Sequence, residues 1–199
     1  MLNGLLRDPV TRVITPLAKG LLRTGISPGV VTASGAIGAV AASALLIPTG
    51  HLFAGALVVG TFALSDLLDG TMARVSGQTS KWGAFLDSNL DRVTDAAIFG
   101  TVAIYYSTRS QLFMVLSLVG MVSGFLVSYA RASAESLGFQ CSGGLIERAE
   151  RLIIVLVAVG LTGLGIPYVA AIGLWSLALG STFTFAQRLR QVHAVGRAA

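Results

Sequence analysis

Residues 66–91 read DLLDGTMARVSGQTSKWGAFLDSNLD, and this stretch decides how the rest of the chain is interpreted. Four aspartates mark it: Asp66, Asp69, Asp87 and Asp91. The first two are three residues apart and the last two are four apart, so on helices each pair lies along one face. An ionised carboxylate near the centre of a bilayer costs roughly 2.5 to 3.5 kcal/mol. Two acidic faces that meet inside a membrane therefore require a positively charged partner.

The composition identifies an integral membrane protein. Of 199 residues, 54% are hydrophobic and 12% are charged, and the mean hydropathy is +0.78, which is too apolar for a soluble domain of this size. Stretches long enough to span a bilayer cover residues 30–48, 51–73, 84–107, 111–130, 152–166 and 167–187. We expect an all-α polytopic fold with six transmembrane helices. It forms a single domain over residues 1–199, with an interfacial helix in 1–26 and the six-helix bundle in 27–192.

Basic residues collect on one side of this expected topology. The amino-terminal segment, the second and fourth connections and the carboxyl tail contain Arg7, Arg12, Lys19, Arg23, Arg74, Lys81, Arg131, Arg148, Arg151, Arg188, Arg190 and Arg197. The connections on the opposite side contain Arg109 alone. The positive-inside rule then predicts a multi-pass protein of a bacterial cell membrane, with both termini in the cytoplasm. It also brings the four aspartates to one depth at the cytoplasmic face.

The amino-terminal residues favour a helix that lies on the membrane surface. No cleavable signal is evident in residues 1–20, where basic and apolar residues alternate. An apolar stripe at near-helical spacing comprises Leu5, Val10, Val13, Ile14, Leu17 and Leu21. The net charge of +5 is explained by the basic cytoplasmic edges, and without interleaved aromatic residues it does not indicate nucleic acid. The single cysteine, Cys141, cannot form an intrachain disulfide.

Carboxylate oxygens without nearby cysteine or histidine suit Mg2+, Mn2+ or Ca2+. Magnesium is favoured because it works with phosphates, and four carboxylates suit two ions, one on each side of a diphosphate. The plainer alternative is a set of packing carboxylates that pair with Arg74, Lys81 and Arg92. Asp95 lies outside the pattern, and for it we expect a packing or supporting role that involves Arg92.

The pattern D-x2-D-G-x2-A-R-x8-G-x3-D-x3-D in residues 66–91 resembles the full signature of the CDP-alcohol phosphotransferases. These integral membrane enzymes move a phosphatidyl-type group from a CDP-linked donor to an alcohol and release CMP. Each specified position of the signature is matched here. The resemblance extends over most of the chain, including the six-span layout, the interfacial helix, and Ser27-Pro28 followed by Thr32.

The resemblance implies a role for each signature residue. Asp66, Asp69 and Asp87 would hold a pair of metal ions, and Asp91 would reach the second ion and act as general base on the acceptor hydroxyl. The residues that would contact the CDP moiety are Gly70, Ala73, Arg74 and Gly83, with Pro28 and Thr32 bordering the nucleotide. The resemblance also implies a homodimer.

Other segments bear on the acceptor. Residues 128–135, 143–154 and 187–189 are similar to those of actinobacterial phosphatidylinositol phosphate synthases. Arg131, Arg151 and Arg188, with Ser133, could then bind a phosphate on the acceptor through charge-assisted hydrogen bonds. The predicted reaction joins CDP-diacylglycerol to inositol phosphate and gives phosphatidylinositol phosphate and CMP.

Four residues depart from the pattern of those relatives. Arg131 replaces the lysine that is usual in those relatives, Ser133 replaces an arginine, Ala149 a proline, and Gly29 an acidic residue. The loss of a base at position 133 bears on acceptor preference.

Four alternatives remain open. The arginines could be membrane-anchoring side chains, and Glu147 and Glu150 could pair with Arg148 and Arg151 within one helical turn. The acceptor could be glycerol 3-phosphate, which would make the chain a phosphatidylglycerophosphate synthase. A divalent-cation transporter would need carboxylates or carbonyls toward the far side of the membrane, where these segments are nearly free of charge.

Overall fold

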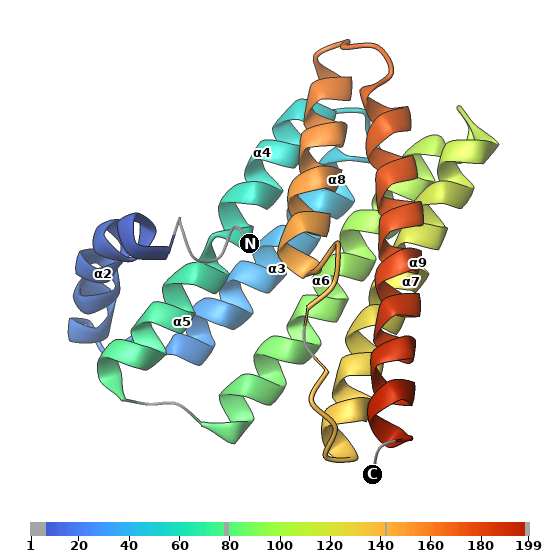
Figure 1. Ribbon diagram of the computed structural model, residues 1–199. Helices are drawn as coiled ribbons and strands as arrows, with labels where there is room; N and C mark the ends of the chain where they lie inside the picture. Colours follow the sequence, from blue (N-terminus) through green and yellow to red (C-terminus); the bar gives the residue numbers. More distant parts are fainter. Residues whose placement is uncertain (1–6, 78–79, 142, 198–199) are drawn as a thin grey trace. The chain divides into compact units, whose positions relative to one another are not determined.

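The computed structural model describes residues 7–77, 80–141 and 143–197, with the backbone alone for residues 7–13. Helices dominate the described residues, which contain no strand, so the all-α prediction is confirmed. The helices are α2 (Arg7–Arg23), α3 (Pro28–Leu46), α4 (Leu52–Ala63), α5 (Ser65–Ser76), α6 (Lys81–Ser107), α7 (Gln111–Ser136), α8 (Arg148–Gly163) and α9 (Val169–Gly196) (Figure 1). Leu5 of the expected amino-terminal stripe lies outside the described residues, and Val10 and Val13 lie outside the described side chains.

Helices occupy all six stretches that the hydropathy pattern identified. Four candidates are long and apolar enough to cross a membrane: α3, α4 with α5 as one stretch over Leu52–Ser76, α7 and α9. The other two stretches are less clear, because α6 carries Asp91, Arg92 and Asp95 into its middle and α8 has 16 residues. The chain is therefore a helical membrane protein with four candidate spans among its described residues.

The chain divides into two compact units, which are described separately. The first unit comprises residues 1–42 and 58–94, and the second comprises residues 43–57 and 95–199. The boundary between residues 94 and 95 falls within α6.

In the first unit, α2 packs against α5 (Figure 1). The buried core of this region joins Ala18 of α2 and Met72 of α5 with Val31 of α3, and Leu68 is among the apolar side chains packed on it. The residues that close α5 and open α6 are specialised for those positions. Gly77 takes a left-handed conformation with φ +67° at the end of α5, which glycine adopts without steric cost. Ser80 precedes α6, and its Oγ accepts a hydrogen bond from the Gly83 N–H at 2.9 Å.

In the second unit, α9 packs against both α7 and α8. The turn between α8 and α9 covers residues 164–168 and contains Gly165 at φ +79°. The connection between α7 and α8 is attached to α9, because the Ile146 N–H donates to Thr184 Oγ1 at 3.0 Å. This attachment places the start of α8 beside α9.

Candidate active site

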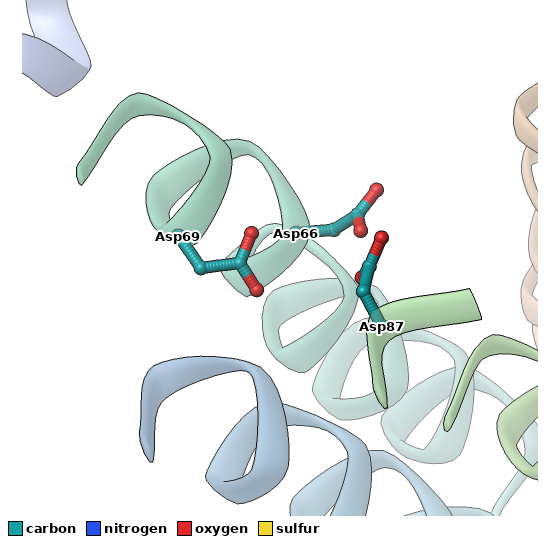
Figure 2. Close-up of side chains that lie close together, drawn as sticks. All are labelled: Asp66, Asp69 and Asp87. Atoms are coloured by element: carbon teal, nitrogen blue, oxygen red, sulfur yellow. The ribbon is translucent and has the colours of Figure 1, made fainter. Parts of the chain in front are cut away.

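Three of the four signature aspartates converge in the first unit. Asp66 and Asp69 project from α5 and Asp87 projects from α6, with their carboxylates directed toward one another (Figure 2). Each offers one oxygen, and these oxygens all lie within 4.8 Å of one another. Asp69 is buried, Asp87 is half-buried and Asp66 is exposed. The spacing of the aspartates predicted that two acidic helix faces meet, and for these three residues the structure confirms it.

Like charges at this separation repel one another. At an effective dielectric constant of about 20, two carboxylates 4.8 Å apart repel by about 3 kcal/mol. A cation among them removes this cost, and a set of hard oxygen donors suits a divalent ion such as Mg2+ or Mn2+. The residues therefore fit a divalent-cation site that is built from two helices.

A side chain from a third helix supports this cluster. Thr32 on α3 donates its hydroxyl hydrogen to Oδ2 of Asp69, and its Oγ1 also lies 3.1 Å from the Pro28 carbonyl oxygen. The family resemblance places Thr32 beside the nucleotide, and it gives this residue no contact with the metal ligands. No local spacing reveals this pairing, because the two residues are 37 positions apart.

Asp91 is arranged differently from the other three aspartates. It follows Asp87 by one helical turn on α6, and its Oδ2 lies 3.5 Å from Nη1 of Arg92. Nη1 of Arg92 also donates to the Ser88 carbonyl oxygen at 2.7 Å. The structure thus brings together three of the four predicted metal ligands and places the fourth one turn further along the helix.

The residues predicted to contact the CDP donor lie in the first unit, on the two helices that carry the aspartates and on α3. Gly70, Ala73 and Arg74 are on α5, Gly83 is in the first turn of α6, and Pro28 and Thr32 are in the first two turns of α3. Arg74 is exposed and lies along α5, since its Nη2 donates to Thr71 Oγ1 at 3.1 Å. A Cβ added at Gly70 would come 3.6 Å from Nη1 of Arg74, so the guanidinium runs beside the glycine.

Arg151 is a buried cation in the second unit. Its side chain is 2% exposed, and Nη2 donates to Oδ2 of Asp95 at 3.0 Å. Nε and Nη1 of the same guanidinium are buried and have no hydrogen-bond partner among the described residues. Arg148 lies on the other side of Asp95, with its Nε 3.6 Å from Oδ1. Asp95 is therefore shared by two arginines of α8, and the expected pairing of Asp95 with Arg92 is replaced by these contacts.

Arg188 on α9 is also buried, and its donors are engaged by the protein. Nη1 donates to the Val127 carbonyl oxygen at 2.7 Å, Nε to the Gly143 carbonyl oxygen at 3.3 Å, and Nη2 to Oε1 of Glu147 at 3.4 Å. Arg188 thus connects α7, the loop before α8 and the start of α8. Glu147 thus pairs with Arg188, and Arg148 and Arg151 both face Asp95, so these residues form ion pairs outside the first turn of α8.

The two remaining candidates for the acceptor phosphate lie near the end of α7. Arg131 has a side chain that is 51% exposed and pairs with Glu135 one turn later, at 2.7 Å. Ser133 is half-buried. Of the four candidates, the structure buries Arg151 and Arg188 and leaves Arg131 at the surface.

Apolar helices of membrane-spanning length and a carboxylate cluster define a class: a membrane protein with a divalent-cation site. A model of the CDP-alcohol phosphatidyltransferase family matches residues 26–186 of this chain. The phosphatidylinositol phosphate synthase of Streptomyces avermitilis is 46% identical over 198 residues, which cover 95% of this chain and 81% of the relative. That of Corynebacterium glutamicum is 43% identical over 186 residues, which cover 92% of this chain and 85% of the relative.

Solved structures agree with the sequence relatives. The crystal structure of Mycobacterium tuberculosis phosphatidylinositol phosphate synthase with CDP-DAG bound matches with a TM-score of 0.86 and 42% identity, covering 91% of this chain and 94% of that one. A second structure of that protein, in complex with manganese and citrate, matches with a TM-score of 0.86 and covers 90% of this chain and 88% of that one. The chain belongs to the CDP-alcohol phosphatidyltransferase family and is a membrane-bound transferase.

Proposed function

We propose that this chain transfers the phosphatidyl group of CDP-diacylglycerol to inositol phosphate, giving phosphatidylinositol phosphate and CMP. The observation that carries the proposal is the convergence of Asp66, Asp69 and Asp87 within a complete family signature. The choice of acceptor is supported by relatives of that activity that are 42 to 46% identical over almost the whole chain.

Metal binding in this proposal involves all four signature aspartates. Asp66, Asp69 and Asp87 would hold two Mg2+ ions, Asp91 would reach the second ion, and Mn2+ could replace Mg2+. When bound, the ions neutralise the negative charge of the donor diphosphate and of the departing CMP. The support for this assignment is the separation of the three carboxylate oxygens, which all lie within 4.8 Å of one another, and their hard-oxygen chemistry.

Asp91 is the catalytic base of the proposed reaction. It accepts the proton of the acceptor hydroxyl while the hydroxyl oxygen forms a bond to the phosphorus of the phosphatidyl group. The bond from that phosphorus to the oxygen of CMP breaks, and CMP leaves with the electron pair. Asp91 lies one turn beyond Asp87 and contacts Arg92. Its position next to the three clustered carboxylates, but outside the cluster, supports a proton-accepting role. A carboxylate near cations is a weak base, so its effect depends on proximity to the hydroxyl.

The donor is held by the small and basic residues of the signature. Gly70, Ala73 and Gly83 leave room for the CDP moiety beside α5 and α6, and Arg74 binds phosphate oxygens. Pro28 and Thr32 border the nucleotide from α3. The exposure of Arg74 beside Gly70 supports this arrangement, because the guanidinium is accessible to a ligand.

The acceptor phosphate is bound by arginines of the second unit. Arg151 is the strongest candidate, because two of its buried nitrogens have no protein partner among the described residues. Leaving buried donors unsatisfied costs about 1 to 3 kcal/mol each, and an anion removes that cost. Arg188, Arg131 and Ser133 complete the proposed set.

The membrane arrangement in this proposal has six spans, with α2 at the interface, both termini and the active site at the cytoplasmic face, and a homodimer as the assembly. The helical stretches at all six positions support the span count. The distribution of basic residues supports the orientation, and the homodimer is supported by the family resemblance.

The test is release of CMP by the purified protein, supplied with CDP-diacylglycerol and Mg2+. Inositol phosphate, glycerol 3-phosphate, inositol and serine are supplied separately as acceptors. We expect turnover with inositol phosphate alone. Asp91→Asn should lower kcat by about 100- to 10,000-fold, the range for loss of a general base.

Each other result has a distinct meaning. Turnover with glycerol 3-phosphate in place of inositol phosphate would keep the reaction and replace the acceptor. CMP release that is unchanged in Asp91→Asn would remove Asp91 from the catalytic role. An absence of CMP with every acceptor would contradict the proposed activity.

A further inference from the structure

Asp95 holds Arg151 by one side of its guanidinium. Nη2 donates to Oδ2 of Asp95 at 3.0 Å, and both side chains are buried. The second carboxylate oxygen of Asp95 faces Nε of Arg148 at 3.6 Å. With its two oxygens divided between two arginines of α8, the carboxylate is fixed in orientation, and a fixed carboxylate in turn fixes the planar guanidinium that it accepts from.

Gly124 on α7 provides the space in which this guanidinium lies. A Cβ added at Gly124 would come 2.9 Å from Nε, 3.1 Å from Cζ and 3.4 Å from Cδ of Arg151. A real Cβ does not tolerate the shortest of these separations, so any larger residue at position 124 displaces the guanidinium. The backbone of α7 at Gly124 therefore limits the position of the guanidinium on one face, and Asp95 limits it at one edge.

The remaining nitrogens of Arg151 have no partner of their own among the described residues. Nε and Nη1 are buried and unpaired, although protein atoms fix the rest of the side chain. If Arg151 served only for packing, its buried donors would remain unsatisfied, and this would lower the stability of the fold. The unsatisfied donors are explained if a bound anion accepts hydrogen bonds from this side chain.

We infer that Asp95 and Gly124 are positioning residues that hold Arg151 so that its unpartnered Nη1 can donate to the phosphate of the acceptor. The inference rests on the proposed function, because it assigns a purpose to Arg151 within that reaction. Neither residue touches the substrate, and both act through the guanidinium.

Orientation of Arg151 by Asp95 and simple charge compensation predict opposite changes in the acceptor KM when Asp95 is removed. If Asp95 merely neutralised Arg151, its removal would leave a more positive site and tighten the binding of a phosphorylated acceptor. If Asp95 orients Arg151, its removal loosens the guanidinium and weakens acceptor binding in spite of the added positive charge. The direction of the change in acceptor KM separates the two roles.

The experiment measures steady-state CMP release by the full-length protein in detergent, with CDP-diacylglycerol and the acceptor varied in turn. Asp95→Asn should raise KM for the acceptor about tenfold, equivalent to about 1.4 kcal/mol. We expect kcat at saturating acceptor and KM for CDP-diacylglycerol to stay within about twofold, because the transition state is reached through the same bound phosphate. Asp95→Glu keeps the charge and should recover part of the affinity.

Gly124→Ala provides a second route to the same result, because it changes no charge. It should raise the acceptor KM in the same selective way as Asp95→Asn. The matched control is Gly100→Ala on α6, where an added Cβ would meet nothing within 4 Å, and its KM should equal that of the unaltered protein. The double variant with Asp95→Asn should show less than the product of the two effects, since both act through one side chain.

An acceptor KM that falls or stays constant in a folded Asp95→Asn protein would overturn the inference. So would a loss of folding in both Asp95→Asn and Gly124→Ala while Gly100→Ala remains intact, because it would assign both residues to stability. The proposed function is tested separately with the unaltered protein. It fails if this protein releases no CMP with any phosphorylated alcohol. If glycerol 3-phosphate is the active acceptor, the same KM comparison is made with it.

Discussion

The two units of the molecule arrange their charged side chains in opposite ways. In the first unit, three aspartates converge so that like charges lie together. In the second unit, Asp95 faces Arg148 and Arg151, and Glu147 pairs with Arg188, so that opposite charges lie together. A cluster of like charges is completed only by a cation from outside, whereas mixed charges compensate one another within the protein. Metal ions should therefore affect the first unit, and removal of a single arginine should affect the second.

Among substitutions that test the contrast between the two units, the largest effect on metal binding is expected from Asp69→Asn, which removes the most buried charge of the aspartate cluster. The variant should bind Mn2+ more weakly and release CMP on the order of 100-fold more slowly. The reason is that a metal ion contributes several kcal/mol of charge stabilisation, and each 1.4 kcal/mol is a factor of ten. Electron paramagnetic resonance of a Mn2+ titration measures the binding, and CMP release measures the rate.

Asp95→Asn is the matched control for metal binding, because it makes the same chemical change at a buried aspartate of the second unit. Its affinity for Mn2+ should equal that of the unaltered protein. Equal loss of Mn2+ binding in both variants would contradict the contrast between the two units, and unchanged binding in Asp69→Asn would remove Asp69 from the metal site.

In the second unit, an effect of similar size, this time on stability, is expected from Arg188→Ala. The substitution removes the partner of the Val127 and Gly143 carbonyl oxygens and of Glu147. We expect a loss of about 3 kcal/mol, since hydrogen bonds to charged groups contribute about 1.5 to 3 kcal/mol each and Glu147 remains partly hydrated. Thermal unfolding in detergent, followed by the fluorescence of the tryptophans, measures the change.

Arg131→Ala is the comparison for Arg188→Ala, because it also breaks an arginine–glutamate pair. The Arg131–Glu135 pair has side chains that are 51% and 52% exposed, and exposed pairs contribute about 0 to 1 kcal/mol. The unfolding temperature of Arg131→Ala should therefore lie close to that of the unaltered protein. Similar destabilisation by the two substitutions would mean that the buried contacts of Arg188 do not hold the second unit together.

The sequence predicted the first unit better than the second, for a physical reason. The positions of the helices and the meeting of the aspartates follow from local periodicity, which short stretches of sequence contain. The partners of the buried arginines do not, since Arg151 meets Asp95 across 56 positions and Arg188 meets Val127 across 61. Such pairings depend on how α6, α7, α8 and α9 pack, and no spacing encodes them.

Helix ends show the same limit in a simpler form. Hydropathy ended the last span at residue 187, whereas α9 continues to Gly196. The apolar run records only the part of a helix that suits a hydrocarbon environment, and a helix can continue into polar surroundings with its backbone hydrogen bonds intact. The opposite case is the interruption at Leu64, where α4 ends and α5 begins within one apolar stretch.

The smallest effect on metal binding is expected from Thr32→Val, which tests whether the first unit orients its aspartates before a metal ion binds. Thr32 donates to Oδ2 of Asp69, and such a contact fixes the orientation of a metal-binding carboxylate. Valine has nearly the same shape without the donor, so Mn2+ affinity should fall about tenfold, the lower end of the range for supporting contacts. The control is Ser34→Ala on the same helix, where the lost hydroxyl donates to the Val31 carbonyl oxygen at 3.1 Å. If both variants bind Mn2+ as the unaltered protein does, Asp69 needs no support from α3. In that case the like-charged cluster is organised by α5 and α6 alone.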